Sequence, residues 1–156
     1  MNEREKEFVE AYPGLFVVAL RAARRVVVER ELAEDIASET LARAYARWSR
    51  ISSYAAPWVT RVAVNLALDH VRRGPAPTPT PPKPDTDAVD RLALTFELAR
   101  LPRRQREAVV LRYVLDLDEE AAARVQGVSV PTLRTHTRRG LARMRTDLHD
   151  VEGAVR

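Results

Sequence analysis

The stretch GVSVPTLRTHTRRGLARMR, residues 127–145, has the sequence of a tight turn followed by a basic helix. Gly127 permits the positive φ of a sharp turn, Ser129 is a good N-cap, and Pro131 fits the first turn of a helix. These residues predict a helix that begins near Val130. Its apolar face consists of residues three or four apart: Leu133, Thr137, Leu141, Met144 and Leu148.

The opposite side of this helix is basic, and no acidic residue occurs between Ser129 and Arg145. The preceding segment, 118–126, has the length of a supporting helix, with Asp118 as its N-cap. Together they predict a helix-turn-helix whose second helix suits the DNA major groove; the alternative is a solvated surface helix rich in arginine. The polar side carries Arg134, Thr135, His136, Arg138, Arg139 and Arg143.

The composition of the 156 residues, 46% hydrophobic and 31% charged, favours two small globular domains. The net charge of +4 favours an acidic partner. There is no cysteine, so disulfides, thiolate metal sites and cysteine nucleophiles are excluded. The histidines are scattered and no glycine-rich phosphate loop occurs, so we expect neither enzyme activity nor a metal or cofactor. No apolar run is long enough to span a membrane and the charged start is no signal peptide, so we expect a cytoplasmic protein.

The first part of the chain is expected to form helices. Apolar positions in residues 1–30 suggest two helical pieces interrupted near Pro13 and Gly14. Residues 31–51 predict one long amphipathic helix. On its charged side Asp35, Glu39 and Arg43 lie four residues apart, a spacing that self-stabilisation of the helix by ion pairs also explains.

A second helix is predicted from Pro57 to Arg73, where Gly74 and Pro75 stop it. Its apolar positions nearly encircle it, so the polar Asn65 and Asp69 need partners. Asn65 suits either a neighbouring backbone group or a nucleic-acid base. Positive charge comes from Arg61, Arg72 and Arg73.

Residues 74–87 hold six of the ten prolines and no large apolar residue, which is typical of a semi-rigid linker. After it, residues 88–150 again have helical spacing, with a break at Pro102 and a second helix over 103–115. No stretch predicts a strand. The expected fold is therefore all-α, with helical domains at 1–73 and 88–150 joined by the linker 74–87.

Read together, three segments resemble the sigma-70 family of bacterial transcription initiation factors. AEDIASETLARAY (33–45) is similar to a helix of sigma region 2, and PWVTRVAVNLALDHVRR (57–73) is similar to the helix that follows it. LARLPRRQREAVVLRYVLDLDEEAAARVQGVSVPTLRTHTRRGLARMR (98–145) is similar to sigma region 4. A linker in place of an intermediate domain is the layout of the extracytoplasmic-function branch.

The resemblance implies a role for each predicted surface. Asp35, Glu39 and Arg43 would dock on the β′ clamp coiled coil of core RNA polymerase. The helix 57–73 would read and open the minus-10 element, with a flipped base near Val62 and Asn65, and with Arg61, Arg72 and Arg73 on DNA. Region 4 would meet the β flap and read the minus-35 element through Ser129, Pro131, Thr132, Arg134, Thr135, His136, Arg138 and Arg139. An anti-sigma factor is a further expected partner.

Two other classes of protein remain open from the residues. A stand-alone helix-turn-helix regulator would use residues 1–73 as a sensor or dimerisation domain and bind duplex sites without polymerase. A sigma-like interaction protein would bind polymerase or an anti-sigma factor without initiating transcription.

Overall fold

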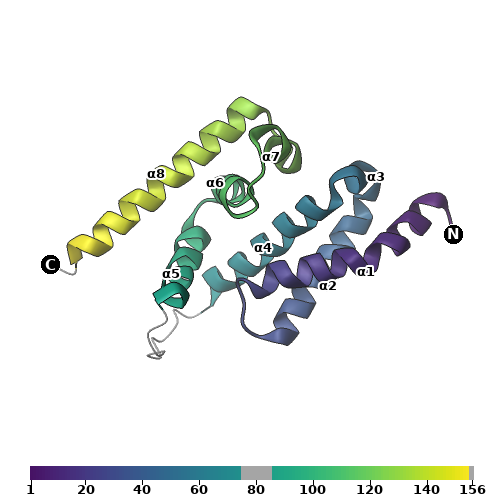
Figure 1. Cartoon of the computed structure of the whole chain (residues 1–156), viewed down its shortest axis with the longest axis horizontal. Helices are drawn as coiled ribbons and strands as arrows, with labels where there is room; N and C mark the ends of the chain where they lie inside the picture. Colours follow the sequence, from purple (N-terminus) through teal and green to yellow (C-terminus); the bar gives the residue numbers. More distant parts are fainter. Residues whose placement is uncertain (75–85, 155–156) are drawn as a thin grey trace. The chain divides into compact units, whose positions relative to one another are not determined.

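The computed structural model describes the backbone of residues 1–74 and 86–154, and the side chains of residues 1–74 and 90–146. Within these ranges every regular element is helical, as predicted (Figure 1). The chain divides into two compact units, Met1–Ala67 and Leu68–Arg156. This division falls inside one helix and before residue 73. The predicted linker 74–87 lies largely outside the described residues, so the domain limits at 73 and 88 stay a prediction.

The first helix, α1 (Glu3–Arg24), begins with a capping box between Asn2 and Glu5. It continues through Pro13, so the predicted interruption there is wrong. A proline inside a helix removes one hydrogen bond and crowds the preceding turn, at a cost of about 3 kcal/mol. Burial of apolar side chains on both sides of Pro13 offsets this cost. The buried side chains of α1 are Phe8, Leu15, Ala19, Ala22 and Ala23.

The second helix, α2 (Arg30–Ala46), is shorter than the helix predicted for residues 31–51. Arg47, with φ −114° and ψ 9°, ends it, and Trp48–Ile51 forms the separate short helix α3. The break places the Trp48 ring 5.2 Å from the Phe8 ring of α1, edge to face. Small residues let α1 and α2 approach closely. Five alanines of these helices are 0% exposed: Ala19, Ala23, Ala33, Ala37 and Ala44.

A short 3-10 turn, η1 (Ser52–Tyr54), leads into α4 (Ala55–Arg73). This helix ends directly before Gly74, as predicted. Its apolar side chains are buried nearly all around, in agreement with the sequence pattern. The most buried are Val59, Ala63, Ala67 and Leu68.

In the second unit, α5 (Thr86–Arg100) and α6 (Arg103–Val109) meet at Pro102, the predicted break. The helix expected over 103–115 changes its hydrogen bonding after Val109. Residues Val110–Val114 form a π-helical segment, η2, closed by a 3.0 Å bond from the N–H of Leu115 to the carbonyl of Val110. Val110 and Leu111 are buried there, whereas Tyr113 is 61% exposed.

The remaining helices are α7 (Glu119–Gln126) and α8 (Val130–Ala154). Gly140 of α8 lies directly against α6. A Cβ atom added there would lie 2.8 Å from Cγ2 of Val109 and 3.2 Å from the carbonyl oxygen of Gln105. The small residue therefore allows the basic helix to pack directly on α6.

Candidate nucleic-acid interface

The predicted helix-turn-helix is present in α7 and α8. The Asp118 side chain accepts a 2.8 Å hydrogen bond from the backbone three residues further on, which caps α7. Gly127 has φ 75°, and its N–H donates to the last turn of α7 at 2.8 Å. Ser129 Oγ accepts from the N–H of Thr132 at 3.3 Å at the start of α8. The cap, turn and start at Val130 predicted from the sequence are therefore confirmed.

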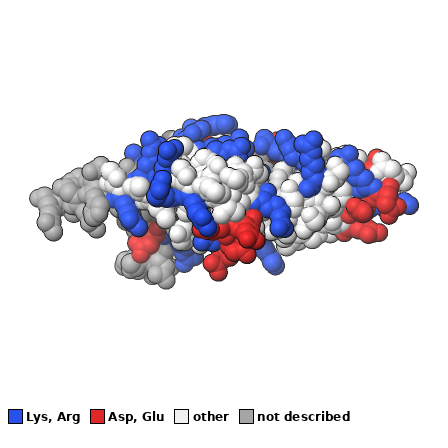
Figure 2. Space-filling view, turned by 90° about the horizontal axis from the view of Figure 1, so that it is seen from above, with Lys and Arg blue, Asp and Glu red and all other residues white. Residues whose placement is uncertain are grey.

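The arginines of α8 are well placed to meet an anion. Arg134, Arg138 and Arg139 are exposed, whereas Thr135 and His136 are half-buried. At the start of the helix and just before it, Ser129, Pro131 and Thr132 are exposed. Lys and Arg side chains cover more of the molecular face in Figure 2 than acidic side chains do. The exposed arginines of α8 attract a polyanion, and they can contact either phosphates or guanine edges.

One of these arginines is held by an acidic residue of the supporting helix. Nε of Arg134 donates to Oε2 of Glu119 at 2.8 Å, and Nη2 of Arg134 lies 2.7 Å from the same oxygen. This hydrogen bond is the main cause that lowers the pKa of the Glu119 carboxyl and raises the pKa of Arg134. Sequence reasoning missed the pair because the two residues are fifteen positions apart in different helices.

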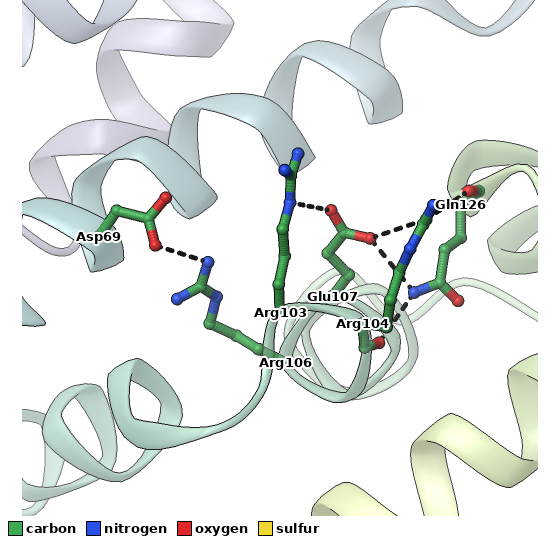
Figure 3. Close-up of polar contacts among 6 residues, drawn as sticks. All are labelled: Asp69, Arg103, Arg104, Arg106, Glu107 and Gln126. Carbon is green, nitrogen blue, oxygen red and sulfur yellow. Dashed lines mark hydrogen bonds and ion pairs between the residues drawn. The ribbon is translucent and has the colours of Figure 1, made fainter.

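A buried carboxylate fixes α6 against the end of α7 (Figure 3). Glu107 is 1% exposed and lies 3.3 Å from Nε of Arg103 and 3.4 Å from Nη1 of Arg104. Nε2 of Gln126 donates to Glu107 at 3.2 Å and to the carbonyl of Arg104 at 2.8 Å. We call Arg103, Arg104, Glu107 and Gln126 the Glu107 cluster. The cluster connects the helix-turn-helix to α6, since Gln126 is the last residue of α7.

A second buried charge lies beside this cluster. Arg106 is 1% exposed, and its Nη2 donates to Oδ1 of Asp69, near the end of α4, at 2.9 Å (Figure 3). The sequence singled out Asp69 as a polar group in need of a partner, and Arg106 supplies it. Arg106 and Glu107 belong to the segment 98–145 that resembles sigma region 4, but their burial is not predicted from the sequence.

The charged line on α2 is exposed as predicted. Asp35, Glu39 and Arg43 lie on the solvent-facing side of the helix. Nε of Arg43 donates to Oε1 of Glu39 at 2.8 Å, the pairing expected from their spacing. An exposed pair of this kind contributes little to stability. Its side chains are accessible to a partner.

The five positions predicted for the minus-10 element all lie on α4, but their exposure differs. Arg72 and Arg73 are exposed, and Arg61 is half-buried with its guanidinium 5.7 Å from the ring centre of Trp58. Val62 is 8% exposed and Asn65 is 5% exposed. The helix therefore carries all five residues without presenting all of them to solvent.

Among the residues with described side chains, no group of three His, Cys, Asp or Glu is arranged to hold a metal ion. In the same part of the chain, no helix combines the length and the apolar character needed to cross a bilayer.

Two family models match the chain, in the order of its two halves. Residues 17–74 match sigma-70 region 2, and residues 91–144 match sigma-70 region 4. The first match covers α2 to α4 with the charged line, and the second covers the Glu107 cluster and the helix-turn-helix.

Similar proteins agree with these matches. The RNA polymerase sigma-E factor of Streptomyces coelicolor is 35% identical over 139 residues, covering 83% of this chain and 78% of that protein. The sigma factor SigW of Bacillus subtilis is 26% identical over 151 residues, covering 76% of each. The structure of CnrH, solved with the cytosolic domain of CnrY, has a TM-score of 0.57 at 19% identity, covering 92% of this chain and 88% of that one; this is a likeness of fold. The chain therefore belongs to the sigma-70 family, as an extracytoplasmic-function sigma factor.

Proposed function

We propose that this protein binds core RNA polymerase and directs it to promoters through a minus-10 and a minus-35 element. The two family regions and the two exposed charged surfaces support this function. The observation that carries it is the exposed arginine face of α8, held by a capped helix-turn-helix within a match to sigma-70 region 4. The polymerase supplies the catalysis, and the protein supplies recognition.

The minus-35 role is assigned to the residues at the start of α8 and along its basic side. The second helix of a helix-turn-helix enters the major groove with its N-terminal residues on base edges. We assign direct contacts to Arg134 and Arg138, whose guanidinium groups suit guanine or phosphate. The other contact positions are Ser129, Pro131, Thr132, Thr135, His136 and Arg139.

Core binding is assigned to the exposed line of Asp35, Glu39 and Arg43 on α2. Stabilisation of the helix by ion pairs explains the contact between Glu39 and Arg43. It does not explain why the exposed Asp35 lies on the same side of the helix, whereas a partner protein that contacts this side would. The partner that we assign to this line is the coiled coil of the β′ clamp. The β flap is the partner we assign to region 4.

The minus-10 role is assigned to α4. A flipped base needs a shaped pocket and a group that hydrogen-bonds its edge, which Val62 and Asn65 are chemically able to provide. Both are nearly buried, and Asn65 already has an interaction within the protein, so base binding requires that interaction to be exchanged. Arg61, Arg72 and Arg73 would contact the DNA backbone beside this pocket.

Two further expectations follow from the proposed function. A sigma factor works where core polymerase is, so we assign the protein to the cytoplasm. CnrH was solved with a protein partner, CnrY, and we propose a protein inhibitor of the anti-sigma kind for this chain. The match of residues 17–74 to sigma-70 region 2 argues against a stand-alone regulator with a sensor domain.

The function is tested by assembling the protein with core polymerase and measuring binding to promoter fragments. We expect the holoenzyme to prefer fragments with both elements over fragments with either element alone. Asp35→Lys should weaken assembly about tenfold or more, whereas Glu10→Lys, the same charge reversal at an exposed position of α1, should not. Binding of the free protein to duplex sites with no contribution from core would instead favour a stand-alone regulator.

A further inference from the structure

The contact between Glu119 and Arg134 joins the two helices of the helix-turn-helix. Glu119 lies in the first turn of α7, and Arg134 lies on the second turn of α8. Their side chains are 34% and 63% exposed, so the guanidinium is held without being buried. A charge-assisted hydrogen bond restricts the rotamers of a long side chain that would otherwise move freely.

The geometry of the pair leaves one side of the guanidinium available. One carboxylate oxygen, Oε2 of Glu119, receives both Nε at 2.8 Å and Nη2 at 2.7 Å. A guanidinium has five N–H donors in a rigid plane, so this contact uses the Nε–Nη2 edge. The outer end, formed by Nη1 and the second hydrogen of Nη2, still offers two parallel donors. Two parallel donors match the O6 and N7 acceptors of guanine in the major groove.

Glu119 is an acidic residue in basic surroundings. It borders an open groove of about 300 Å³ whose other charged lining residues are Arg112, Arg134, Arg138 and Arg145. Glu119 is thus the one acidic residue among those that line this groove. The nearby Arg112 also lowers the pKa of the Glu119 carboxyl, so the acid stays ionised at neutral pH.

We propose that Glu119 is a positioning residue that sets base specificity, by holding the Arg134 guanidinium edge-on so that its outer end reads a guanine in the promoter. The proposal rests on the proposed minus-35 role of α8. A fixed guanidinium suits a planar, two-acceptor target better than a single phosphate oxygen. The carboxylate also repels the DNA backbone, which weakens contacts that do not use the guanine.

The proposal separates specificity from affinity, because removing Glu119 changes the two in opposite directions. Loss of a negative charge near DNA raises binding to every sequence. Loss of the fixed geometry lowers the preference for guanine over the other bases at one position. A well-formed bidentate contact favours guanine over the other bases by roughly tenfold to a hundredfold, and we expect most of this preference to depend on the contact between Glu119 and Arg134.

The test uses the full-length protein in holoenzyme with core polymerase and a promoter library randomised over the minus-35 element. Sequencing of the bound fraction gives the base preference at each position. Arg134→Ala identifies the position that Arg134 reads. Glu119→Ala should reduce the guanine preference at that same position by about tenfold and leave the other positions unchanged. Glu120→Ala, which removes the same charge from the exposed neighbour, should leave the preference intact.

A double variant completes the test. In the Arg134→Ala background, Glu119→Ala should have no further effect on base preference, because the guanidinium it positions is gone. The proposal is overturned if Glu119→Ala and Glu120→Ala change the preferences equally, or if the position lost in Arg134→Ala does not prefer guanine. Absence of any enriched minus-35 motif with the wild-type protein would contradict the proposed function itself.

Discussion

Substitution of Gly140 by alanine tests how tightly the basic helix α8 is packed on α6. An added Cβ would meet Cγ2 of Val109 at 2.8 Å, several tenths of an ångström inside ordinary contact, and the backbone oxygen of Gln105 at 3.2 Å. Val109 is 4% exposed and β-branched, so its side chain has little freedom to withdraw. Overpacking of this kind costs about 1–3 kcal/mol, and the higher helix propensity of alanine returns about 1 kcal/mol.

We therefore expect Gly140→Ala to destabilise the second unit by about 1 kcal/mol. The matched background is Val109→Ala, which removes the methyl group nearest to the added Cβ and costs about 2 kcal/mol by itself. In that background Gly140→Ala should be neutral or stabilising, because the main clash is absent and the added methyl fills part of the space. The sign of the effect thus depends on a single neighbouring side chain.

Native-state hydrogen exchange measures this effect locally. Both tryptophans, Trp48 and Trp58, belong to the first compact unit, so their fluorescence does not report on α6 and α8. Amides in α6 and α8 should exchange faster in Gly140→Ala, and those in α1 and α2 should be unchanged. Slower exchange in α6 and α8, with Val109 present, would refute the close packing.

Three further variants test separate parts of the molecule. Arg138→Ala should weaken binding of holoenzyme to minus-35 DNA and lower the slope of log affinity against log salt by about one; an unchanged slope would mean that Arg138 contacts no phosphate. Asn65→Ala should slow open-complex formation, followed by permanganate reactivity of unpaired thymines, more than it weakens closed-complex binding; equal loss of both would argue against base capture by Asn65. Glu107→Gln should destabilise the second unit by only about 1–2 kcal/mol, because two of the partners of Glu107 are exposed arginines. Urea unfolding, followed by hydrogen exchange of the α7 amides, measures this loss, and unchanged exchange would contradict the prediction.

The parts of the fold set by local chemistry could be predicted from the sequence. Asp118, Gly127 and Ser129 determine the ends of α7 and α8 through caps and a positive φ, and each acts on residues close in the chain. The break at Pro102 and the end of α4 at Gly74 are likewise determined by a single residue next to the end of a helix. Such signals need no knowledge of tertiary contacts.

Predictions failed where packing between helices decided the result. Pro13 is a local helix breaker, yet α1 continues through it because apolar residues before and after it are buried together. The helix predicted to reach residue 51 ends at Ala46, where the break lets the Trp48 ring reach Phe8. The π-helical segment after Val109 likewise has no local signature in the sequence.

The candidate site divides in the same way. Exposure of Asp35, Glu39 and the arginines of α8 followed from helical spacing alone. The contact between Glu119 and Arg134 did not, because it depends on the angle between two helices, and the spacing of residues along the chain does not define that angle. Charge patterns predict which side chains are available, and the three-dimensional structure is needed to see which of them hold one another.

The most direct measurement of the central claim is runoff transcription with purified core polymerase, with and without this protein, on a library of promoter fragments. We expect discrete new transcripts that depend on the protein and start a fixed distance downstream of a shared pair of sequence elements. Arg134→Ala should reduce their yield, and mutation of the upstream element should do the same. Binding of the protein to core without any new transcript would contradict the account, and would instead identify a sigma-like protein that does not initiate.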